Sequence, residues 1–400
     1  MARNTKRKVR RRGRRKKRGF ASWSLGKKIG AVLGGTFLAV AVIGMVILAS
    51  KMNKLKSVKL NTDKLNISDE VQHEEGYTNV ALFGLDSREN DLGKGNRSDT
   101  TMIASLNNDT KEVKLVSIYR DTLLELDDGS YNKANAAYAF GGPEGAVSLI
   151  NRNLDMNIEK YVTVNFNALV DVIDAVGGLD LELTHDEVVH MNNYCVETSK
   201  VTGKSYEKIE PEVEGTYHLN GVQAVSYSRI RYTAGGDFKR AERQRRVLNE
   251  LIKKAKDASL TELNELVSTI FPEVSTDLTQ KDIISMMPVM LKYDMANSGG
   301  FPYDKTTDTP SKKIGSIVIP CDLESNVIQL HKQLFGTEDY QPSETVQSYN
   351  DTIIDLTGKT TKDSETDQFS DQDDFFGNGT QQNSNNSGDG GADSSASDSQ

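Results

Sequence analysis

Residues 226–246, SYSRIRYTAGGDFKRAERQRR, gather seven cationic side chains around a two-glycine loop that opens into a predicted helix. Arg229 and Arg231 alternate, so on an extended segment their side chains point the same way. Arg240 and Gln244 lie four residues apart on the helix and therefore share a face. Guanidinium groups bind phosphate oxygens through paired N–H donors, and a helix N-terminus favours anions. The stretch therefore predicts a phosphate-binding site.

The alternative for these cations is a solvated helix face. It accounts well for Arg245 and Arg246, which follow the predicted face on the same helix. It accounts poorly for Arg229 and Arg231, because arginines that converge repel one another unless an anion lies between them.

Two further polar clusters are expected at one edge of a sheet. Asp86 directly follows one apolar strand, Asp99 closely precedes the next, and Arg120 and Asp121 follow a third. Charges at adjacent strand ends can converge at the edge where α/β proteins bind ligands. Two carboxylates there suit Mg²⁺ (or Mn²⁺), since such a hard cation takes one or two protein carboxylates together with phosphate oxygens. The alternative is a polar loop with two unrelated aspartates.

Other chemistry is not indicated. The sequence has no Walker loop, HExxH or GxSxG motif, and its five histidines are scattered, so none is assigned a catalytic role. Cys195 and Cys321 are too few for a disulfide framework or a zinc cluster, although they could form one bridge.

Charge is sorted along the chain. Residues 1–50 hold 14 Lys and Arg and no acid, which leaves 35 basic against 57 acidic residues, a net charge of −22, in 51–400. The uncharged run 29–50 can span a bilayer core, which needs about 20 helical residues. Its positive flank predicts a cytoplasmic N-terminus and an uncleaved signal anchor. We interpret the flank as a topology signal that touches anionic lipid; nucleic-acid binding by a basic arm is the alternative.

The predicted organisation has five parts. They are a basic cytoplasmic segment (1–28), a transmembrane signal anchor (29–50), a stalk (51–75), an extracellular catalytic domain (76–346) and a disordered acidic tail (347–400). Strands are predicted at 78–85, 101–106, 113–119, 161–166, 177–183 and 315–320, and helices at 133–154, 166–176 and 237–258, the last with Asp237 as N-cap. The alternation predicts an α/β fold, with a central mixed β-sheet between helical layers.

These residues predict a divalent cation and several arginines around a di- or triphosphate on the outer side of the membrane. Nucleoside triphosphates are scarce there, whereas the membrane itself delivers lipid-linked pyrophosphates. The arginines of 226–246 are then the counter-charge of a phosphate ligand.

Seven motifs follow one another between Asn79 and Leu251. They are LFGLDSR, RSDTTMI, SIYRD, NKANAAYAFGGPEGA, DAVGGLDLEL, LNGVQAVSYSRIR and DFKRAERQRRVL. The set resembles the LytR-CpsA-Psr family of cell-envelope proteins. The resemblance implies an α/β/α fold with an apolar pocket for a polyprenyl chain and a pyrophosphate at its mouth. It also implies a phosphotransferase that moves a glycopolymer from undecaprenyl pyrophosphate to a peptidoglycan hydroxyl, forming a phosphodiester, with pyrophosphatase activity when water replaces the acceptor.

The resemblance also assigns roles to individual residues. Asp86 and Asp99 resemble the pair that binds Mg²⁺. The set resembling the pyrophosphate-binding residues is Arg88, Arg97, Arg120, Arg229, Arg231, Arg240 and Gln244. Arg120, Asp121 and Asp99 are the candidate catalytic residues, Asp121 being a candidate proton acceptor, and Asp121 and Asp237 are candidate orienters of the arginines. One departure is Tyr119, where the family usually has proline, so the backbone of this loop is open to question.

Two apolar helix faces, at 136–150 and 166–176, are candidates for the wall of the lipid pocket. Ordinary hydrophobic core is the alternative for each residue on them. The expected partners are the undecaprenyl-pyrophosphate-linked glycopolymer, peptidoglycan and the membrane, without nucleic acid. The polymer itself, whether teichoic acid, capsule or a related wall polysaccharide, stays open.

Two other functions are kept as alternatives. A transcriptional regulator of envelope genes would need a DNA-binding fold in the cytoplasm, where residues 1–28 are too few to form one. A non-catalytic scaffold that only binds lipid or polymer would not require Asp86, Asp99 and the arginine set.

Overall fold

The computed structural model of this 400-residue chain describes residues 56–57, 59–86, 92–257, 274–278, 292–312 and 314–365. The predicted basic segment, the signal anchor and most of the predicted tail lie outside these residues. Among the helices that are described, none combines the length and the apolar character that crossing a bilayer requires.

A central mixed sheet organises the described chain. Its strands, in spatial order, are β1 (Lys56–Ser57), β10 (Val274–Thr276), β7 (Lys160–Asn165), β2 (Tyr77–Leu85), β3 (Ser98–Asn107), β4 (Glu112–Ile118) and β11 (Asp294–Phe301). β2 pairs in parallel with β7 and antiparallel with β3, and β4 pairs in parallel with β11. The predicted mixed sheet is confirmed.

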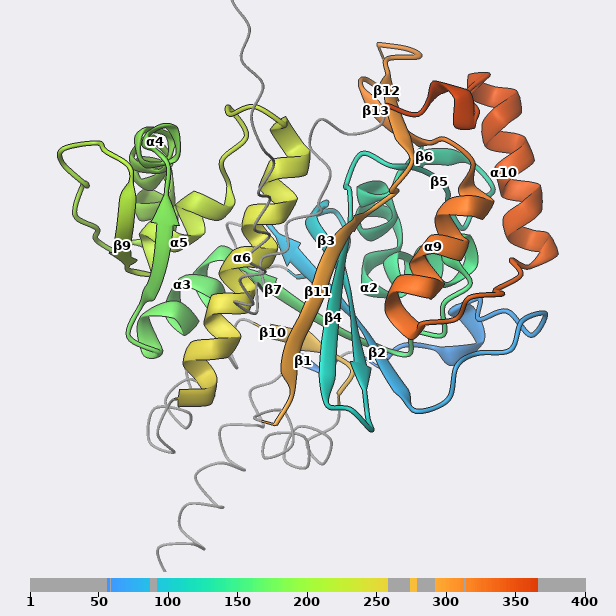
Figure 1. The fold of residues 1–400 in the computed structure, drawn as a ribbon, viewed down its shortest axis with the longest axis horizontal. Coiled ribbons are helices and arrows are strands. Elements are labelled where there is room, and N and C mark those ends of the chain that lie inside the picture. The colour runs from blue at the N-terminus through green and yellow to red at the C-terminus, as the bar shows by residue number, and fades with distance from the viewer. Residues whose placement is uncertain are drawn as a thin grey trace, which may run out of the picture. The chain divides into compact units, whose positions relative to one another are not determined.

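Helices cover both faces of this sheet (Figure 1). The helices are α2 (Asn135–Leu154), α3 (Phe166–Ala175), α4 (His185–Thr202), α5 (Gly221–Ser228), α6 (Gly236–Asp257), α9 (Leu323–Phe335) and α10 (Glu344–Thr357), with short 3₁₀ turns η2 (Thr62–Lys64) and η4 (Thr361–Asp363). α2, α9 and α10 lie on one side and α3 to α6 on the other. The three predicted helices match α2, α3 and α6, whereas α4, α5, α9 and α10 were not predicted.

Three two-stranded ribbons lie outside the central sheet. They are β5 (Leu123–Glu125) with β6 (Tyr131–Lys133), β8 (Leu179–Leu183) with β9 (Gly215–Leu219), and β12 (Lys305–Asp308) with β13 (Ile317–Pro320). The strands predicted at 177–183 and 315–320 therefore exist, but they belong to ribbons and not to the main sheet.

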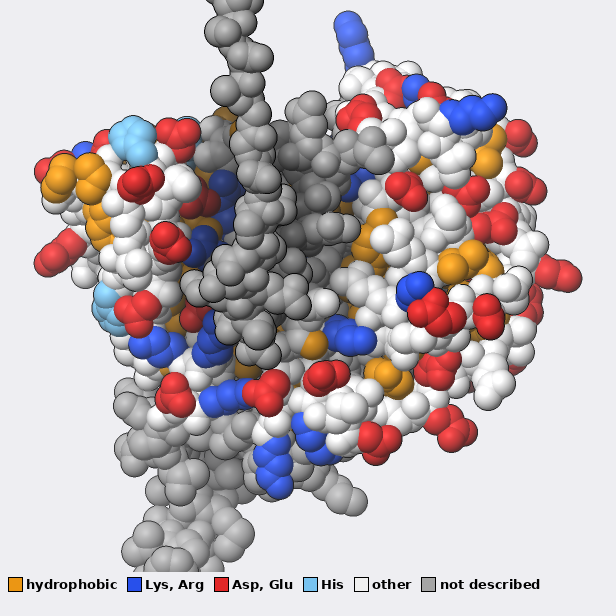
Figure 2. Space-filling view, in the orientation of Figure 1, with side chains coloured by type: hydrophobic (Ala, Val, Ile, Leu, Met, Phe, Trp, Pro, Cys, Tyr) orange, Lys and Arg blue, Asp and Glu red, His pale blue; other side chains and the backbone are white. Residues whose placement is uncertain are grey.

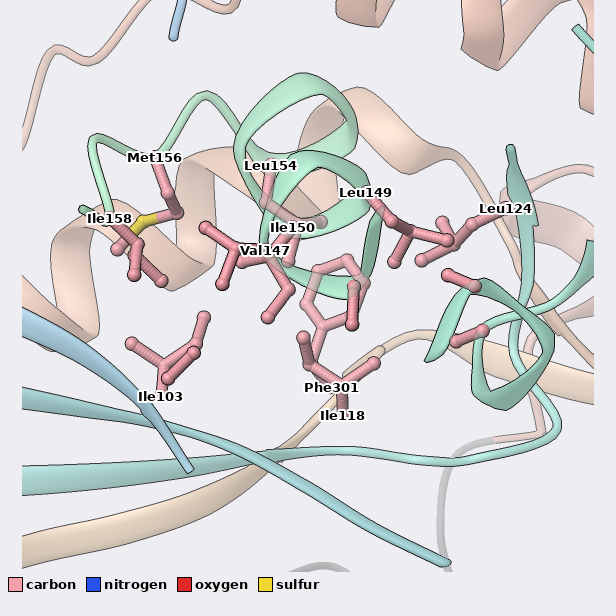
Figure 3. Packing of buried hydrophobic residues seen from close by; sticks show 14 of the residues in the cluster. Ile103, Ile118, Leu124, Val147, Leu149, Ile150, Leu154, Met156, Ile158 and Phe301 are labelled. Carbon is pink, nitrogen blue, oxygen red and sulfur yellow. The ribbon is translucent and has the colours of Figure 1, made fainter. Parts of the chain in front are cut away.

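The main core lies between the sheet and α2. Figure 3 shows Val147 and Ile150 of α2 near Ile103, Ile118 and Phe301 from β3, β4 and β11. All five side chains are buried in one apolar cluster. α2 is kinked where the sequence has Gly-Gly-Pro, since Gly142 has φ 67°, a conformation that favours glycine. The broken helix predicted at 133–154 is confirmed, and its apolar face packs in the core.

A second cluster lies on the opposite side of the sheet, among α3, α4, α5 and the β8–β9 ribbon. Val170, Ile173, Val188, Met191 and Tyr227 are all buried in it. This cluster fixes α3 and α6 beside the sheet face formed by alternate residues of β2, β3 and β7, where the cavity described below is found.

Two predicted boundaries are wrong. Leu65 is 0% exposed and packs in the main core, so the segment assigned to the stalk belongs in part to the folded domain. α10 runs to Thr357 and buries Val346 and Ile353, so the boundary predicted after residue 346 falls inside a helix. In both places a few well-spaced apolar residues in a polar stretch were enough to pack against the domain.

Charged side chains are unevenly spread over the surface. In Figure 2, Asp and Glu are scattered over the part formed by α9 and α10, while Lys and Arg gather nearer α6. Near α6 in Figure 2, the Lys and Arg side chains lie among acidic ones, whereas acidic side chains predominate over α9 and α10.

Candidate active site

The sheet register brings the predicted polar residues to one edge. The pairing of β2 with β3 shifts after Gly84 and skips Asp99, which is therefore the extra residue of a β-bulge. A bulge re-aims a side chain out of the regular pleat. The chain continues from β4 into Arg120, whose Nη1 donates to Asp99 Oδ1 at 2.6 Å. The structure thus brings Asp99 and Arg120 together, as their places at strand ends predicted.

Asp237 joins three arginines in the first turn of α6. Its Oδ1 lies 3.7 Å from Arg120 Nε, 3.5 Å from Arg231 Nε and 3.1 Å from Arg240 Nη2. Burial raises the pKa of this carboxyl above its ordinary value, and Arg120 and Arg231 oppose that rise. The helix begins at Gly236, so Asp237 is its second residue. The prediction that Asp237 is the N-cap is therefore wrong.

Asp99 contacts the same three arginines as Asp237. Its Oδ2 lies 3.7 Å from Arg231 Nη2, and its backbone carbonyl accepts a hydrogen bond from Arg240 Nη2 at 2.9 Å. Burial by itself lowers the pKa of Arg120, but Asp99, Asp237 and Asp121 outweigh burial and raise it. Two carboxylates therefore share three guanidinium groups.

Two buried N–H donors in this cluster make no hydrogen bond within the described part of the chain. Among the described residues, Arg120 Nε and Arg240 Nε are buried without a hydrogen-bond partner. A buried donor without a partner costs about 1–3 kcal/mol. Arg120 Nε still faces the carboxylates of Asp121 and Asp237, at 3.4 and 3.7 Å, so it is paired by charge. Arg240 Nε could therefore donate to an oxygen of an anion bound at this cluster.

Asp121 lies next to this cluster and pairs with a lysine from a distant motif. Lys133 Nζ is 2.9 Å from Asp121 Oδ1, and Arg120 Nε is 3.4 Å from its Oδ2. Lys133 ends β6 and belongs to the NKANAAY motif, but the sequence did not single it out. Asp121 therefore orients Arg120 from the side away from Asp99.

Arg229 and Arg231 do not lie on an extended segment, and that prediction is wrong. Arg229 caps α5 in a helical conformation, and Arg231 lies in the irregular loop that follows. Arg229 donates to Thr198 Oγ1 at 2.9 Å and pairs with Glu197 at 3.1 Å, both on α4. Both arginines nevertheless line the same cavity, because the loop replaces the alternation of a strand.

α6 carries arginines with different environments. Arg240 and Gln244 line the cavity, as their shared face predicted. Arg243 is buried instead against α4, where its Nε donates to Glu187 Oε1 at 2.8 Å. Arg245 is 2% exposed, so its assignment to a solvated face is wrong. Arg246 is half-buried and donates to the Tyr227 hydroxyl at 3.1 Å.

The other predicted site residues differ in whether they line the cavity. Asp86 is exposed at the end of β2 and lines the cavity together with Asp99. Arg97 is exposed before β3 and is not among the described residues that line the cavity. Arg88 lies outside the described residues.

A cavity of about 420 Å³ opens at this cluster. Its apolar wall is built from the sheet, from α3 and from α6; the side chains include Leu82, Met102, Val162, Leu169, Val172, Val247 and Leu248. Asp99, Arg231 and Arg240 line its polar part. Gly84 faces it from β2, where a Cβ would approach Thr100 Cβ to 3.0 Å. Two helix faces were predicted to line a lipid pocket. The face at 166–176 does line the cavity. The face at 136–150 packs in the main core, so the prediction for it is wrong.

Several residues near the cavity were missed by the sequence reasoning. Tyr194 of α4 and Tyr232 line it, and the Arg229 guanidinium lies 4.6 Å from the Phe166 ring. Tyr119, which stands where the family usually has proline, packs edge-on against Phe238 with ring centroids 4.6 Å apart. For Tyr232 the sequence signal was an aromatic next to an arginine, which is too common to be specific, and for Tyr194 there was no such signal.

The cysteines do not form the bridge that the sequence left open. Cys195 and Cys321 are each buried as free thiols. Burial raises the pKa of both to about 11. Cys195 packs in the second cluster, and Cys321 directly follows β13, so the two thiols belong to different parts of the fold.

Comparison with known proteins places this geometry in a family. The chain is 34% identical over 275 residues to "Polyisoprenyl-teichoic acid--peptidoglycan teichoic acid transferase TagU" of Bacillus cereus (strain AH820), covering 66% of this chain and 80% of that protein. It is 30% identical over 283 residues to the protein of the same name from Enterococcus faecalis (strain ATCC 700802 / V583), covering 68% and 86%.

Solved structures share the fold. A structure of TagT bound to LI-WTA covers 70% of this chain and 98% of its own, with a TM-score of 0.55 and 23% identity, a likeness that shows the fold alone. The protein gbs0355 from Streptococcus agalactiae also gives a TM-score of 0.55, at 25% identity, covering 67% and 90%. The sequence profile of the LytR_cpsA_psr family matches residues 42–299. The chain therefore belongs to the LytR_cpsA_psr family, which confirms the resemblance found in its motifs.

Proposed function

We propose that this protein transfers a glycopolymer from a polyprenyl pyrophosphate, undecaprenyl pyrophosphate in the cell, to a hydroxyl of peptidoglycan, forming a phosphodiester. One observation carries the proposal. An apolar cavity, lined at its polar part by Asp99, Arg231 and Arg240, opens at a cluster where three arginines share two carboxylates. A ligand that fits must have a long apolar part joined to a compact anion with several oxygens.

The names of the relatives support the transferase part of the proposal. The curated relatives are named teichoic acid transferases, and the chain spans about four fifths of their length. These names favour teichoic acid as the polymer over capsule or another wall polysaccharide.

Divalent cation binding is part of the proposal, and the residues present fit it. Asp86 and Asp99 line the same cavity as the arginines. Among the described residues there is no cluster of three or more metal-binding side chains. Two carboxylates suit Mg²⁺ or Mn²⁺, which complete their coordination with water and phosphate oxygens. When bound, such an ion would neutralise charge that develops on the phosphate oxygens.

The residues of the chain would act on the reacting phosphates as follows. Arg120, Arg231 and Arg240 hold the pyrophosphate oxygens and stabilise charge on the leaving polyprenyl phosphate. The acceptor oxygen attacks the sugar-proximal phosphorus, a P–O bond forms to it, and the bond to the leaving phosphate breaks. Asp121, between Arg120 and Lys133, is the candidate acceptor of the hydroxyl proton. Water as acceptor would give pyrophosphatase activity.

The proposed location follows from the sequence. Residues 29–50 would anchor the chain in the cell membrane as a single span, with the N-terminus in the cytoplasm and the catalytic domain outside. The lipid donor then reaches the cavity from the same membrane.

The test uses the full chain in detergent with undecaprenyl pyrophosphate, with and without Mg²⁺, and follows release of phosphate. We expect metal-dependent turnover that Arg120→Ala abolishes. Arg246→Ala is the matched control, because Arg246 donates to Tyr227 and keeps turnover under this proposal. Tight binding without turnover in the wild type would favour the non-catalytic scaffold instead.

A further inference from the structure

A row of aromatic side chains leads out of the cavity mouth. The rings of Tyr194 and Tyr232 are stacked with centroids 6.4 Å apart and an interplanar angle of 27°. The His190 ring lies 6.4 Å from Tyr232. These separations are within the range of about 4.5–7 Å typical of interacting rings. Tyr194 and Tyr232 also line the cavity, so the row begins at the proposed ligand site.

One face of α4 supplies most of this surface. His190, Tyr194 and Glu197 are separated by four and three residues, which places them on one face of the helix. Glu197 is half-exposed and pairs with Arg229 Nη2 at 3.1 Å. The face thus combines flat rings with a carboxylate next to the arginine cluster.

The row is continuous with the apolar wall of the cavity. The Arg229 guanidinium lies 4.6 Å from the Phe166 ring and 5.7 Å from the Tyr194 ring. From inside to outside the order is therefore Phe166, Arg229, Tyr194 and Tyr232. A ligand whose apolar chain lies in the cavity and whose phosphates lie at the arginines must place its next group beside Tyr194 and Tyr232.

The exposure of Tyr232 is unusual for a residue that serves stability alone. Its side chain is 77% exposed, more than Phe140 at 66%. An aromatic ring held open beside a pocket, with one flat apolar face and polar groups around it, is typical of a binding surface. A pyranose ring has a matching surface, since its C–H face is apolar and its edge carries hydroxyl groups.

We propose that Tyr232 and Tyr194, with His190 and Glu197, form a subsite for the first sugar attached to the pyrophosphate of the donor. The inference rests on the proposed function and adds to it the part of the donor that these residues recognise. The sugar ring lies on the exposed face of the tyrosines, and Glu197 accepts hydrogen bonds from its hydroxyl groups. The subsite lets the protein distinguish a donor that carries its polymer from the bare lipid.

The test compares two ligands of the full chain in detergent. Dissociation constants are measured by calorimetry for undecaprenyl pyrophosphate alone and for the same lipid carrying one N-acetylhexosamine. We expect Tyr232→Ala to weaken binding of the sugar-bearing lipid by about five- to tenfold, the scale of a lost ring contact. Binding of the bare lipid stays within about twofold. Tyr232→Phe keeps the ring and therefore the affinity, and Phe140→Ala is the control for loss of an exposed aromatic.

Each outcome decides between the two proposals. An equal loss for both ligands, or no loss for either, overturns the sugar subsite while the proposed function stands. Wild-type protein that binds neither lipid overturns the proposed function, and the subsite with it. Because Tyr232 is exposed, its replacement leaves the fold intact, so a change in affinity is not a sign of unfolding.

Discussion

Replacement of Asp237 tests how the arginine cluster is held. Asp237 lies 3.1–3.7 Å from Arg120, Arg231 and Arg240. Removing one partner of a buried pair costs roughly 3–5 kcal/mol, whereas an exposed pair contributes about 0–1 kcal/mol. The Asp237 side chain is 27% exposed, Arg240 is 4% exposed and Arg231 is 34% exposed. For this mixed environment we expect Asp237→Ala to lower the free energy of unfolding by about 1–3 kcal/mol.

The expected effect on turnover is a fall in kcat without a rise in KM. The variant loses the group that orients Arg120 towards the reacting phosphate, and a loss of about 1.4–2.8 kcal/mol in the transition state is a 10- to 100-fold fall in kcat. The lost negative charge leaves the cluster more cationic, so ground-state attraction for the pyrophosphate is kept or strengthened. Steady-state kinetics with the sugar-bearing lipid, beside thermal unfolding, would separate the two effects.

The pH profile gives a second measure of the same residue. The pKa of Asp237 is raised by burial, so on acidification its carboxylate is protonated at a higher pH than an ordinary aspartate. The pairing is present above that pKa and lost below it, so kcat of the wild type should fall on the acid side. Asp237→Asn should lack this fall. A KM that rises while kcat is unchanged, or an unaltered enzyme, would refute the orienting role.

Two other predictions concern the cavity and the cysteines. Val172→Trp places a larger side chain in the apolar wall and should weaken binding of undecaprenyl pyrophosphate by about tenfold or more, while inorganic pyrophosphate binds as before in a competition assay. Equal loss of both ligands would contradict a separate lipid cavity. Burial raises the pKa of Cys195 and Cys321 to about 11, so at pH 8 about one thiol in a thousand is ionised. Native protein should resist iodoacetamide at pH 8 and react at both thiols after denaturation; rapid native labelling would show that the cores open.

The meeting of polar residues at one sheet edge could be predicted from sequence, because it depends only on which residues stand at the ends of neighbouring strands. Asp99 and Arg120 each follow or precede a β-branched run, and antiparallel neighbours must bring such ends together. The bulge at Asp99 could not be predicted, because it depends on how β2 and β3 pair and not on either strand alone.

The arginines of α6 show which contacts helical spacing can predict and which it cannot. Helical spacing grouped Arg240 with Gln244 correctly, since both face one way. It could not show that Arg243 meets Glu187, which lies 56 residues earlier, or that Arg245 is buried. Those contacts depend on how α6 packs against α4, and α4 itself was missed because its apolar residues are few and its sequence is polar.

Asp99 pairs with Arg120 and is also a proposed cation ligand, and these two tasks explain why Arg120 needs Asp237 as a further partner. Asp99 Oδ1 accepts a hydrogen bond from Arg120 Nη1 at 2.6 Å. If Asp99 also helps to hold a cation, as proposed, its Oδ1 is shared, and part of the Arg120 guanidinium becomes available to a phosphate oxygen. Asp237 and Asp121 would still hold Arg120 Nε from behind, at 3.7 and 3.4 Å, so the side chain keeps its position while its partner changes. Carboxylates on two sides of one arginine thus allow it to exchange a carboxylate for a phosphate without leaving the site.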